Sequence, residues 1–172
     1  MSGLAFRLAE ARDAALVRAI SAEAYIPAYR AAIGAVPKPA FEDYRERIAR
    51  REVWVAETEG AAAGVVVLEP RADHWLVYSL AVRPRYQRRG FGKALLGFAE
   101  TLAGETGVPE LRLYTNRRME RNLALYRDSG FVETGTRPHP SRAGEVLVDM
   151  AKPVPPAAES VARKSQFRPG FD

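Results

Sequence analysis

The sequence predicts an α/β (α+β) fold, built on a central sheet whose strands are mostly antiparallel. Two apolar runs, 53–57 and 64–68, are separated by a short glycine turn, which is typical of a β-hairpin. Further along, strand-like runs at 75–82 and 111–115 alternate with helical patterns. Sheet and helix signals therefore interleave along 172 residues, a length that suits one domain with a sizeable core.

The N-terminal part is predicted to supply one short strand and two helices. Residues 6–8 alternate between apolar and polar side chains, as a short strand does. Asp13 is the expected N-cap of a first helix, which the proline-containing stretch 25–29 interrupts. Pro37 and Pro39 are expected to open a second helix with apolar residues three and four positions apart. These apolar residues are Phe41, Tyr44 and Ile48.

The second half is predicted to alternate between helices and strands. The expected elements are a helix over 91–102, a strand over 111–115, a helix over 119–129, and strands over 131–132 and 146–148. Gly130 suits the position that ends a helix in a left-handed conformation. Residues 153–172 contain four prolines and show no apolar periodicity. We therefore expect one domain over residues 1–152 and a proline-containing tail over 153–172.

Composition is that of an ordinary globular protein, and it excludes several kinds of site. Hydrophobic residues make up 47% and charged residues 27%, and no apolar run approaches the roughly 18 residues of a membrane span. The N-terminus lacks a basic region followed by an apolar stretch, so we expect no secretory signal and a cytoplasmic location. The absence of cysteine excludes disulfides, thiolate metal sites and a cysteine nucleophile, and we expect no metal.

A formal net charge of +5 favours an anionic partner, either a nucleic acid or a polyanionic small molecule. No basic stripe interleaved with aromatic residues, as an RNA-binding sheet would carry, is present. Nucleic-acid binding also predicts a strongly salt-dependent affinity for DNA or RNA. We interpret the basic cluster at 83–93 as cover for the phosphates of a small ligand.

The turn that follows the strand at 75–82 is the most informative segment. From Gln87 to Lys93 it reads Gln-Arg-Arg-Gly-Phe-Gly-Lys, and it opens the predicted helix. A helix start presents unpaired N–H groups and partial positive charge, and glycines let a diphosphate approach the backbone. Lys93 is followed by Ala94, so the turn is no P-loop, and the first glycine of the dinucleotide fingerprint is missing. We therefore predict a diphosphate site of another kind.

In this context the sequence resembles the GNAT superfamily of N-acetyltransferases. Leu-Ala-Val-Arg-Pro at 80–84, followed by Gln-x-x-Gly-x-Gly from Gln87, is similar to that family's acyl-CoA pyrophosphate segment. Downstream, the segments 111–116 and 122–131 resemble its second motif and stand in the same order. The similarity extends from about Val53 to Lys152.

The resemblance implies an acetyl-CoA-dependent N-acetyltransferase, with one acyl-CoA N-acyltransferase domain over residues 1–152. It implies six to seven strands, about four flanking helices, and a sheet that splays between its fourth and fifth strands. A main-chain N–H near Val82 is expected to polarise the thioester carbonyl. The expected acetyl-CoA contacts are Leu80, Ala81, Val82, Gln87, Arg88, Arg89, Gly90, Phe91, Gly92, Lys93 and Asn122.

Tyr126 is the candidate general acid, because it stands at the tyrosine of the family's Leu-Tyr-x-x-x-Gly-Phe signature. A phenol with a pKa of about 10 can protonate a thiolate whose conjugate acid has a pKa near 8.5. The alternative is a core tyrosine with a satisfied hydroxyl. Asn122 lies one turn before Tyr126 and shares its face. Met119 stands where many relatives have an asparagine, so Asn116 and Asn122 both remain candidates for cofactor contact.

The general base is not specified by the sequence. Leu76 and Tyr114 stand where many relatives carry a glutamate on the fourth or fifth strand. The remaining candidates are Glu69, His74, Tyr78 and Tyr114, or no base at all for an amine of low pKa. The missing carboxylates favour an alternative function, a catalytically silent acyl-CoA-binding module, whereas Tyr126 argues against it.

The acceptor is expected to be a primary amine on a small molecule or a peptide, since the fold serves many acceptor classes. Tyr25, Tyr29 and Ile33 fall at helical spacing and are candidates either for the acceptor wall or for the core. If Arg137 and Arg142 face the site, a carboxylate-bearing acceptor is favoured. Dimers are common in the family, so a homodimer stays open.

Overall fold

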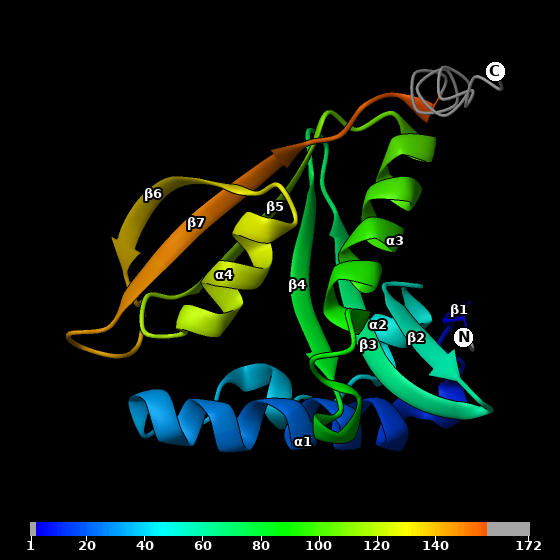
Figure 1. Ribbon diagram of the computed structural model, residues 1–172, viewed down its shortest axis with the longest axis horizontal. Helices are drawn as coiled ribbons and strands as arrows, with labels where there is room; N and C mark the ends of the chain where they lie inside the picture. Colours follow the sequence, from blue (N-terminus) through cyan, green and yellow to red (C-terminus); the bar gives the residue numbers. More distant parts are fainter. Residues whose placement is uncertain (1–2, 158–172) are drawn as a thin grey trace, which may run out of the picture.

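One seven-stranded sheet runs through the computed structural model, which describes residues 3–157 (Figure 1). The strands follow the order β1-β2-β3-β4-β5-β7-β6, and every neighbouring pair is antiparallel except β4 and β5. The strands are β1 (Ala5–Leu8), β2 (Val53–Thr58), β3 (Ala61–Pro70), β4 (Trp75–Val82), β5 (Glu110–Asn116), β6 (Val132–Pro138) and β7 (Val146–Pro153). The predicted fold class is therefore confirmed.

Helices cover both faces of the sheet (Figure 1). In the described residues these are α1 (Ala14–Ile33), α2 (Arg45–Ala49), α3 (Phe91–Thr106) and α4 (Glu120–Asp128), with 3-10 turns η1 (Ala11–Asp13), η2 (Lys38–Ala40) and η3 (Pro84–Tyr86). Alternate residues of β3 enter two cores: Val66 and Leu68 pack in the core of α3 and α4, Val65 and Val67 in that of α1 and α2. A strand buried on both faces needs a continuous apolar run, as β3 has.

The sheet opens between β4 and β5, where the two ribbons diverge in Figure 1. These strands pair only at residues 75–76 of β4. On the other side of β4, Tyr78 has no partner in the ladder, because the register shifts between Val67 and Leu68 of β3. Such a bulge bends and twists its strand, which turns β4 away from β5. The splay between the fourth and fifth strands is confirmed.

Helix α1 continues through Pro27 to Ile33, so the predicted interruption at 25–29 was wrong. A proline inside a helix removes one N–H donor and crowds the preceding turn, but tertiary contacts override such local preferences. The hydroxyl of Tyr25, two residues before the proline, donates to β4, and α1 packs along β3 and β4. The helix ends at Gly34, whose φ of 66° suits a left-handed cap.

The segment after α1 forms η2 and the short α2 instead of the single helix that Pro37 and Pro39 predicted. Neither proline has an N–H group, so a continuous helical ladder cannot form there. Tyr44 is buried as expected, and its hydroxyl donates to the carbonyl of Pro39 at 2.6 Å. Phe41 is 55% exposed, contrary to the predicted apolar helix face.

The C-terminal part forms the far edge of the sheet. β6 is exposed along its length, and the predicted loop over 137–142 begins two residues later, at His139. The predicted tail starts at Pro153, the last residue of β7. Val154 is still buried, and its N–H donates to the segment before β5. Residues 158–172 of the predicted tail lie outside the described residues.

The described residues contain neither a candidate membrane span nor a candidate metal cluster. Within residues 3–157, no helix combines the length and the apolar character needed to cross a bilayer. The longest, α1, carries charged side chains at Arg18, Glu23 and Arg30. Over the same residues, no three histidine, cysteine, aspartate or glutamate side chains are grouped so that they would hold a metal ion.

Asp13 precedes α1 as predicted but makes different contacts. Its carboxylate accepts hydrogen bonds from Arg7 and from the N–H of Glu10, both at 2.7 Å, and does not cap α1. The hydrogen bonds from Arg7 lower the pKa of Asp13, although burial acts in the opposite direction. A lowered pKa stabilises the fold above the unfolded pKa of about 3.9, and this stabilisation is lost as the pH falls through the folded value.

We expect Asp13→Asn to lower the free energy of unfolding at neutral pH by about 1 kcal/mol, since a charge-assisted bond is weakened. Urea unfolding at several pH values measures this. The variant is also expected to lose less stability than the wild type between about pH 4 and pH 2. Asp128→Asn is the control, because Asp128 is exposed and forms no ion pair with the described residues. Equal acid sensitivity of Asp13→Asn and the wild type would contradict the assignment.

Candidate active site

The predicted diphosphate segment forms a strand, a turn and a helix start. β4 ends at Val82, η3 follows, and α3 begins directly after Gly90. Arg88 and Gly90 have left-handed conformations, with φ of 60° and 80°. The first bond of α3 joins the Ala94 N–H to the Gly90 carbonyl at 3.0 Å, so the N–H groups of residues 91–93 have no helical partner. The turn therefore offers a row of donors to an anion.

This turn borders a cavity of about 770 Å³, the loop cavity, which α1, the end of β4 and the start of α4 also enclose. Most of the predicted acetyl-CoA contacts line it: Leu80, Val82, Gln87, Arg88, Gly90, Phe91, Gly92, Lys93 and Asn122. Ala81 and Arg89 do not line it. The side chain of Ala81 is buried in the core beneath α1, and the guanidinium of Arg89 lies over the rings of Tyr86 and Phe91.

Sequence analysis identified Asn122 of α4 but not the other parts of the loop-cavity wall that α1 and the segment 118–121 contribute. Arg118, just before α4, and Arg121, in its first turn, add two cations to the lining of this cavity, and Glu120 adds one carboxylate. The small residues of α1 that line it are Ala24, Ala28, Ala31 and Ala32. Their spacing of three and four is the signal of one helical face, but the predicted interruption of this helix concealed it.

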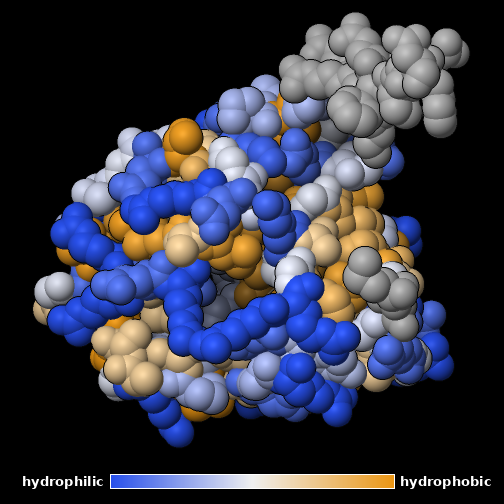
Figure 2. All heavy atoms as spheres, viewed as in Figure 1, coloured by the Kyte–Doolittle hydropathy of each residue, from blue (hydrophilic) through white to orange (hydrophobic). Residues whose placement is uncertain are grey.

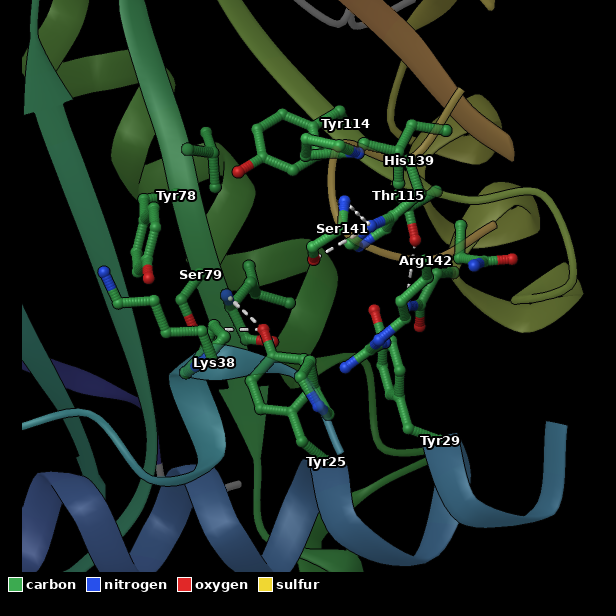
Figure 3. Close-up of a pocket in the computed structure, with 18 of the residues that line it drawn as sticks. Tyr25, Tyr29, Lys38, Tyr78, Ser79, Tyr114, Thr115, His139, Ser141 and Arg142 are labelled. Carbon is green, nitrogen blue, oxygen red and sulfur yellow. Dashed lines mark hydrogen bonds between the residues drawn. The ribbon is translucent and has the colours of Figure 1, made fainter. Parts of the chain in front are cut away.

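A second cavity, of about 490 Å³, occupies the opening between β4 and β5 and is called the splay cavity (Figure 3). Strands β4 and β5, helix α1, the segment 37–41 and the loop 139–142 form its walls. Figure 2 shows a hollow on this face, above α1 and beside β4, with hydrophilic residues along its rim. The residues that line both cavities are Tyr25, Tyr29, Leu80 and Asn122. The two cavities therefore adjoin at β4 and share these four residues in their walls.

Where the two cavities adjoin, β4 is not paired with β5. The hydroxyl of Tyr25 hydrogen-bonds to the main chain of β4 there instead. It donates to the Leu80 carbonyl at 2.9 Å and accepts from the Leu80 N–H at 3.0 Å. The hydroxyl of Ser79 lies 3.0 Å away. Burial raises the pKa of Tyr25, so its phenol stays protonated and serves as donor and acceptor at once. One tyrosine of α1 thus satisfies both main-chain groups of Leu80 in the open sheet.

Tyr126 is 8% exposed and lines the splay cavity. Its ring meets Phe131 edge-on, with the ring centroids 6.1 Å apart. No residue in the described range 3–157 hydrogen-bonds to its hydroxyl. Burial, with a further contribution from Tyr25 and Tyr29, raises the pKa of Tyr126 well above its usual value. The phenol therefore remains protonated at neutral pH and is available as a proton donor.

The two candidate asparagines occupy different places. Asn116 is buried, donates to Glu145 at 2.9 Å and accepts from the N–H of Arg118 at 2.9 Å. These bonds fix the turn between β5 and α4. Asn122 makes a single long bond of 3.5 Å to Thr115 and lines both cavities. The geometry therefore favours Asn122 as the asparagine available to a ligand.

The four candidate bases separate into two pairs. Tyr78 and Tyr114 line the splay cavity, whereas Glu69 and His74 do not. Glu69 is held in ion pairs with two arginines. Burial raises its pKa, but these arginines outweigh that effect and lower it overall. His74 contacts the carboxylate of its neighbour Asp73 at 2.7 Å. Proton transfer within the splay cavity is therefore open to the two tyrosines.

Glu42, which sequence analysis did not single out, stands behind Tyr78. The Tyr78 hydroxyl donates to one carboxylate oxygen of Glu42 at 2.6 Å, and Arg47 pairs with the other at 2.7 Å. Arg47 is buried, lies 3.7 Å from the centre of the Tyr78 ring, and also pairs with Glu52 and Glu69. Burial and the bond to Glu42 raise the pKa of Tyr78. A cavity phenol is thus connected directly to a carboxylate.

These features belong to an α/β protein with an open sheet. The start of α3 forms a candidate anion site, and the adjoining splay cavity contains the buried phenol of Tyr126. The family model described as "Acetyltransferase (GNAT) family" matches residues 18–131. Since that match covers more than half of the sequence, the chain belongs to the GNAT acetyltransferase family. The resemblance seen in the sequence is confirmed.

Relatives and solved structures agree with this membership. Mouse N-acetyltransferase family 8 member 3 is 34% identical over 88 residues, which cover 48% of this chain and 39% of that protein. The E. coli ribosomal-protein-S18-alanine N-acetyltransferase superposes with a TM-score of 0.70 at 21% identity, over 89% of this chain and 95% of its own. PaiA N-acetyltransferase from Thermoplasma acidophilum, in complex with coenzyme A, gives 0.72 at 20% identity, over 88% and 99%. At these identities the structures show the fold.

Proposed function

We propose that this protein transfers the acetyl group of acetyl-CoA to a primary amine, which attacks directly in a ternary complex. The observation that supports this most is the meeting of the loop cavity and the splay cavity at Leu80, beside Tyr126. The loop cavity suits coenzyme A, because unpaired N–H groups and the cations Arg88 and Lys93 complement a diphosphate. The splay cavity gives an amine its own approach to the same point.

Each step of the reaction is assigned to a residue that lines these cavities or contacts their lining. The N–H of Leu80 exchanges its hydrogen bond to the Tyr25 hydroxyl for one to the thioester carbonyl oxygen. There it stabilises the negative charge that develops during attack. As the amine nitrogen bonds to the carbonyl carbon and the carbon–sulfur bond breaks, Tyr126 gives its proton to the departing sulfur. Tyr78 accepts the proton of the amine while passing its own to Glu42. Glu42 then releases this proton to solvent and Tyr126 regains one from solvent, so both groups return to their starting states and protons and charges balance.

A thiol-release assay over a panel of amines, with mass spectrometry of the products, tests this function. We expect thiol release that requires the amine, together with a product heavier by one acetyl group. Tight binding of acetyl-CoA without amine-dependent thiol release would instead indicate a catalytically silent acyl-CoA-binding module.

Glu42→Gln and Tyr78→Phe are each expected to lower kcat/KM by about 10- to 100-fold, the usual effect of losing a general base. The double variant should lose no more than the stronger single variant, because the pair acts as one unit. We compare kcat/KM of the wild type and the variants from about pH 6 to pH 9.5, which shows how the loss of activity depends on pH. The deficit is expected to be largest at low pH, where the amine is protonated, and to shrink as the amine deprotonates by itself.

Glu46→Gln is the matched control, since Glu46 is 80% exposed and pairs with Arg50 at the surface. Its kcat/KM is expected to equal that of the wild type. Thermal unfolding of each variant reports any loss from the Arg47 ion pairs. A deficit that stays constant across the pH range would contradict a proton relay through Tyr78.

A further inference from the structure

The splay cavity has a strongly one-sided charge. Among residues 3–157, its lining contains four basic side chains and no aspartate or glutamate. The basic residues are Lys38, Arg137, His139 and Arg142, and they come from η2, the end of β6 and the following loop. A cavity of this sign attracts anions and repels polycations.

Two of these side chains are cations without a carboxylate partner in the described part of the chain. Arg137 is neutralised, because its guanidinium donates to both oxygens of Asp149 at 3.0 and 3.1 Å and lies over the Tyr114 ring. Lys38 and Arg142 form no ion pair with any residue in the described part of the chain. Arg142 is half-buried, so part of its hydration is lost and an anionic ligand is a favourable partner.

The position of Arg142 is fixed by the protein. One guanidinium nitrogen donates to the carbonyl of Val36 at 2.7 Å, which joins the loop after β6 to the segment that leads to Lys38. Figure 3 shows Arg142 and Tyr29 on the same side of the splay cavity. Since one bond leaves other guanidinium N–H groups unused, Arg142 keeps donors for a planar oxyanion.

His139 adds a neutral donor to this group. The N–H of Ser141 donates to its Nδ1 at 3.1 Å, which places the proton of the neutral ring on Nε2. Burial and the charge of Arg142 lower the pKa of His139, against a weaker opposite effect from Glu145. With Nδ1 occupied, the ring offers Nε2–H as a donor and no free acceptor. His139 therefore complements an anion and does not suit the role of base.

We propose that the acceptor is a small amine that also carries an anionic oxyacid group, such as a carboxylate or phosphonate, bound by Arg142, Lys38 and His139. This inference rests on the proposed function and names its substrate class. A cavity of about 490 Å³ accommodates a small molecule. The nearby cations also lower the pKa of the bound ammonium group, which favours the neutral amine that attacks. Polyamines and other polycations are disfavoured by the same charges.

Matched pairs of acceptors test the proposal by thiol release. The pairs are L-phenylalanine with L-phenylalaninamide, β-alanine with β-alaninamide, and L-glutamate with its diamide, L-glutaminamide, and spermidine serves as the polycation. The amide of each pair has the more readily deprotonated amine, so intrinsic reactivity favours the amide. We expect kcat/KM for at least one acid to exceed that of its amide by about tenfold or more, as a charge-assisted contact requires.

Two substitutions test whether Lys38 and Arg142 cause the preference for acids over amides. Lys38→Met and Arg142→Gln are each expected to lower the acid-to-amide ratio of kcat/KM about tenfold. Within residues 3–157 the side chain of Lys38 makes no hydrogen bond or ion pair that the change would break, so its effect separates charge from folding. Arg127→Gln, at an exposed arginine outside the cavity, is the control and should keep the wild-type ratio.

Acetyl-CoA binding, measured by calorimetry on the same proteins, separates this inference from the proposed function. Equal turnover of acids and amides, a preference for spermidine, or turnover of no acid by a protein that binds acetyl-CoA overturns the inference alone. Failure of the wild type to bind acetyl-CoA overturns the proposed function as well.

Discussion

Gly90→Glu is expected to weaken acetyl-CoA binding at least about a hundredfold, which corresponds to roughly 3 kcal/mol. Gly90 has a φ of 80°, and its carbonyl accepts the first hydrogen bond of α3. A residue with a Cβ is strained in this left-handed conformation, and a carboxylate places negative charge where the donors of residues 91–93 would meet a diphosphate. Calorimetric titration with acetyl-CoA measures the loss.

Two further variants separate strain from charge. Gly97→Glu makes the same chemical change on the exposed surface of α3, where a Cβ meets no atom within 4 Å, and should bind acetyl-CoA like the wild type. Gly90→Ala introduces the strain without the charge, so its affinity should fall between those of the wild type and Gly90→Glu. Wild-type affinity in Gly90→Glu would place the diphosphate elsewhere.

Tyr126→Phe is expected to lower kcat about 10²- to 10⁴-fold, the range for a lost general acid, while acetyl-CoA affinity stays the same. The ring remains to pack against Phe131, and the hydroxyl has no hydrogen bond within residues 3–157 to lose. Steady-state thiol release and calorimetry together give the two quantities. Tyr114→Phe removes another phenol of the splay cavity, one that is 41% exposed, and should retain most of the activity.

The pH dependence of the wild type gives an independent check on Tyr126. Since burial raises its pKa, the proton-donating form persists above the usual phenol pKa of about 10. We therefore expect kcat to show no loss on the alkaline side below about pH 10. An alkaline limb in the wild type near pH 8 that disappears in Tyr126→Phe would contradict the raised pKa.

Local sequence was sufficient to predict elements whose cause is local. The apolar run of β3, the turn from Gln87 to Gly90 and the helix end at Gly130 each follow from residues within a few positions. The path of α1 through Pro27 was not predictable in this way, because the bonds of Tyr25 to Leu80 cross 55 positions of the chain. Tertiary packing decided that helix against its local preference.

The candidate site shows the same division. The residues of the turn and Tyr126 could be proposed from the sequence alone, because each belongs to a short motif in one segment. The pairing of Glu42 with Tyr78 joins positions 36 apart, and the bond from Arg142 to Val36 joins positions 106 apart. Neither pair has a sequence pattern, so the proposed proton path and the basic lining of the splay cavity could be inferred only from the fold.

Calorimetric titration of the wild-type protein with acetyl-CoA tests the central claim most directly. The structure predicts binding in the micromolar range, near −8 kcal/mol, with the diphosphate at the turn before α3. Absence of binding at sub-millimolar acetyl-CoA would contradict the assignment of the loop cavity, and with it the proposed acetyl transfer.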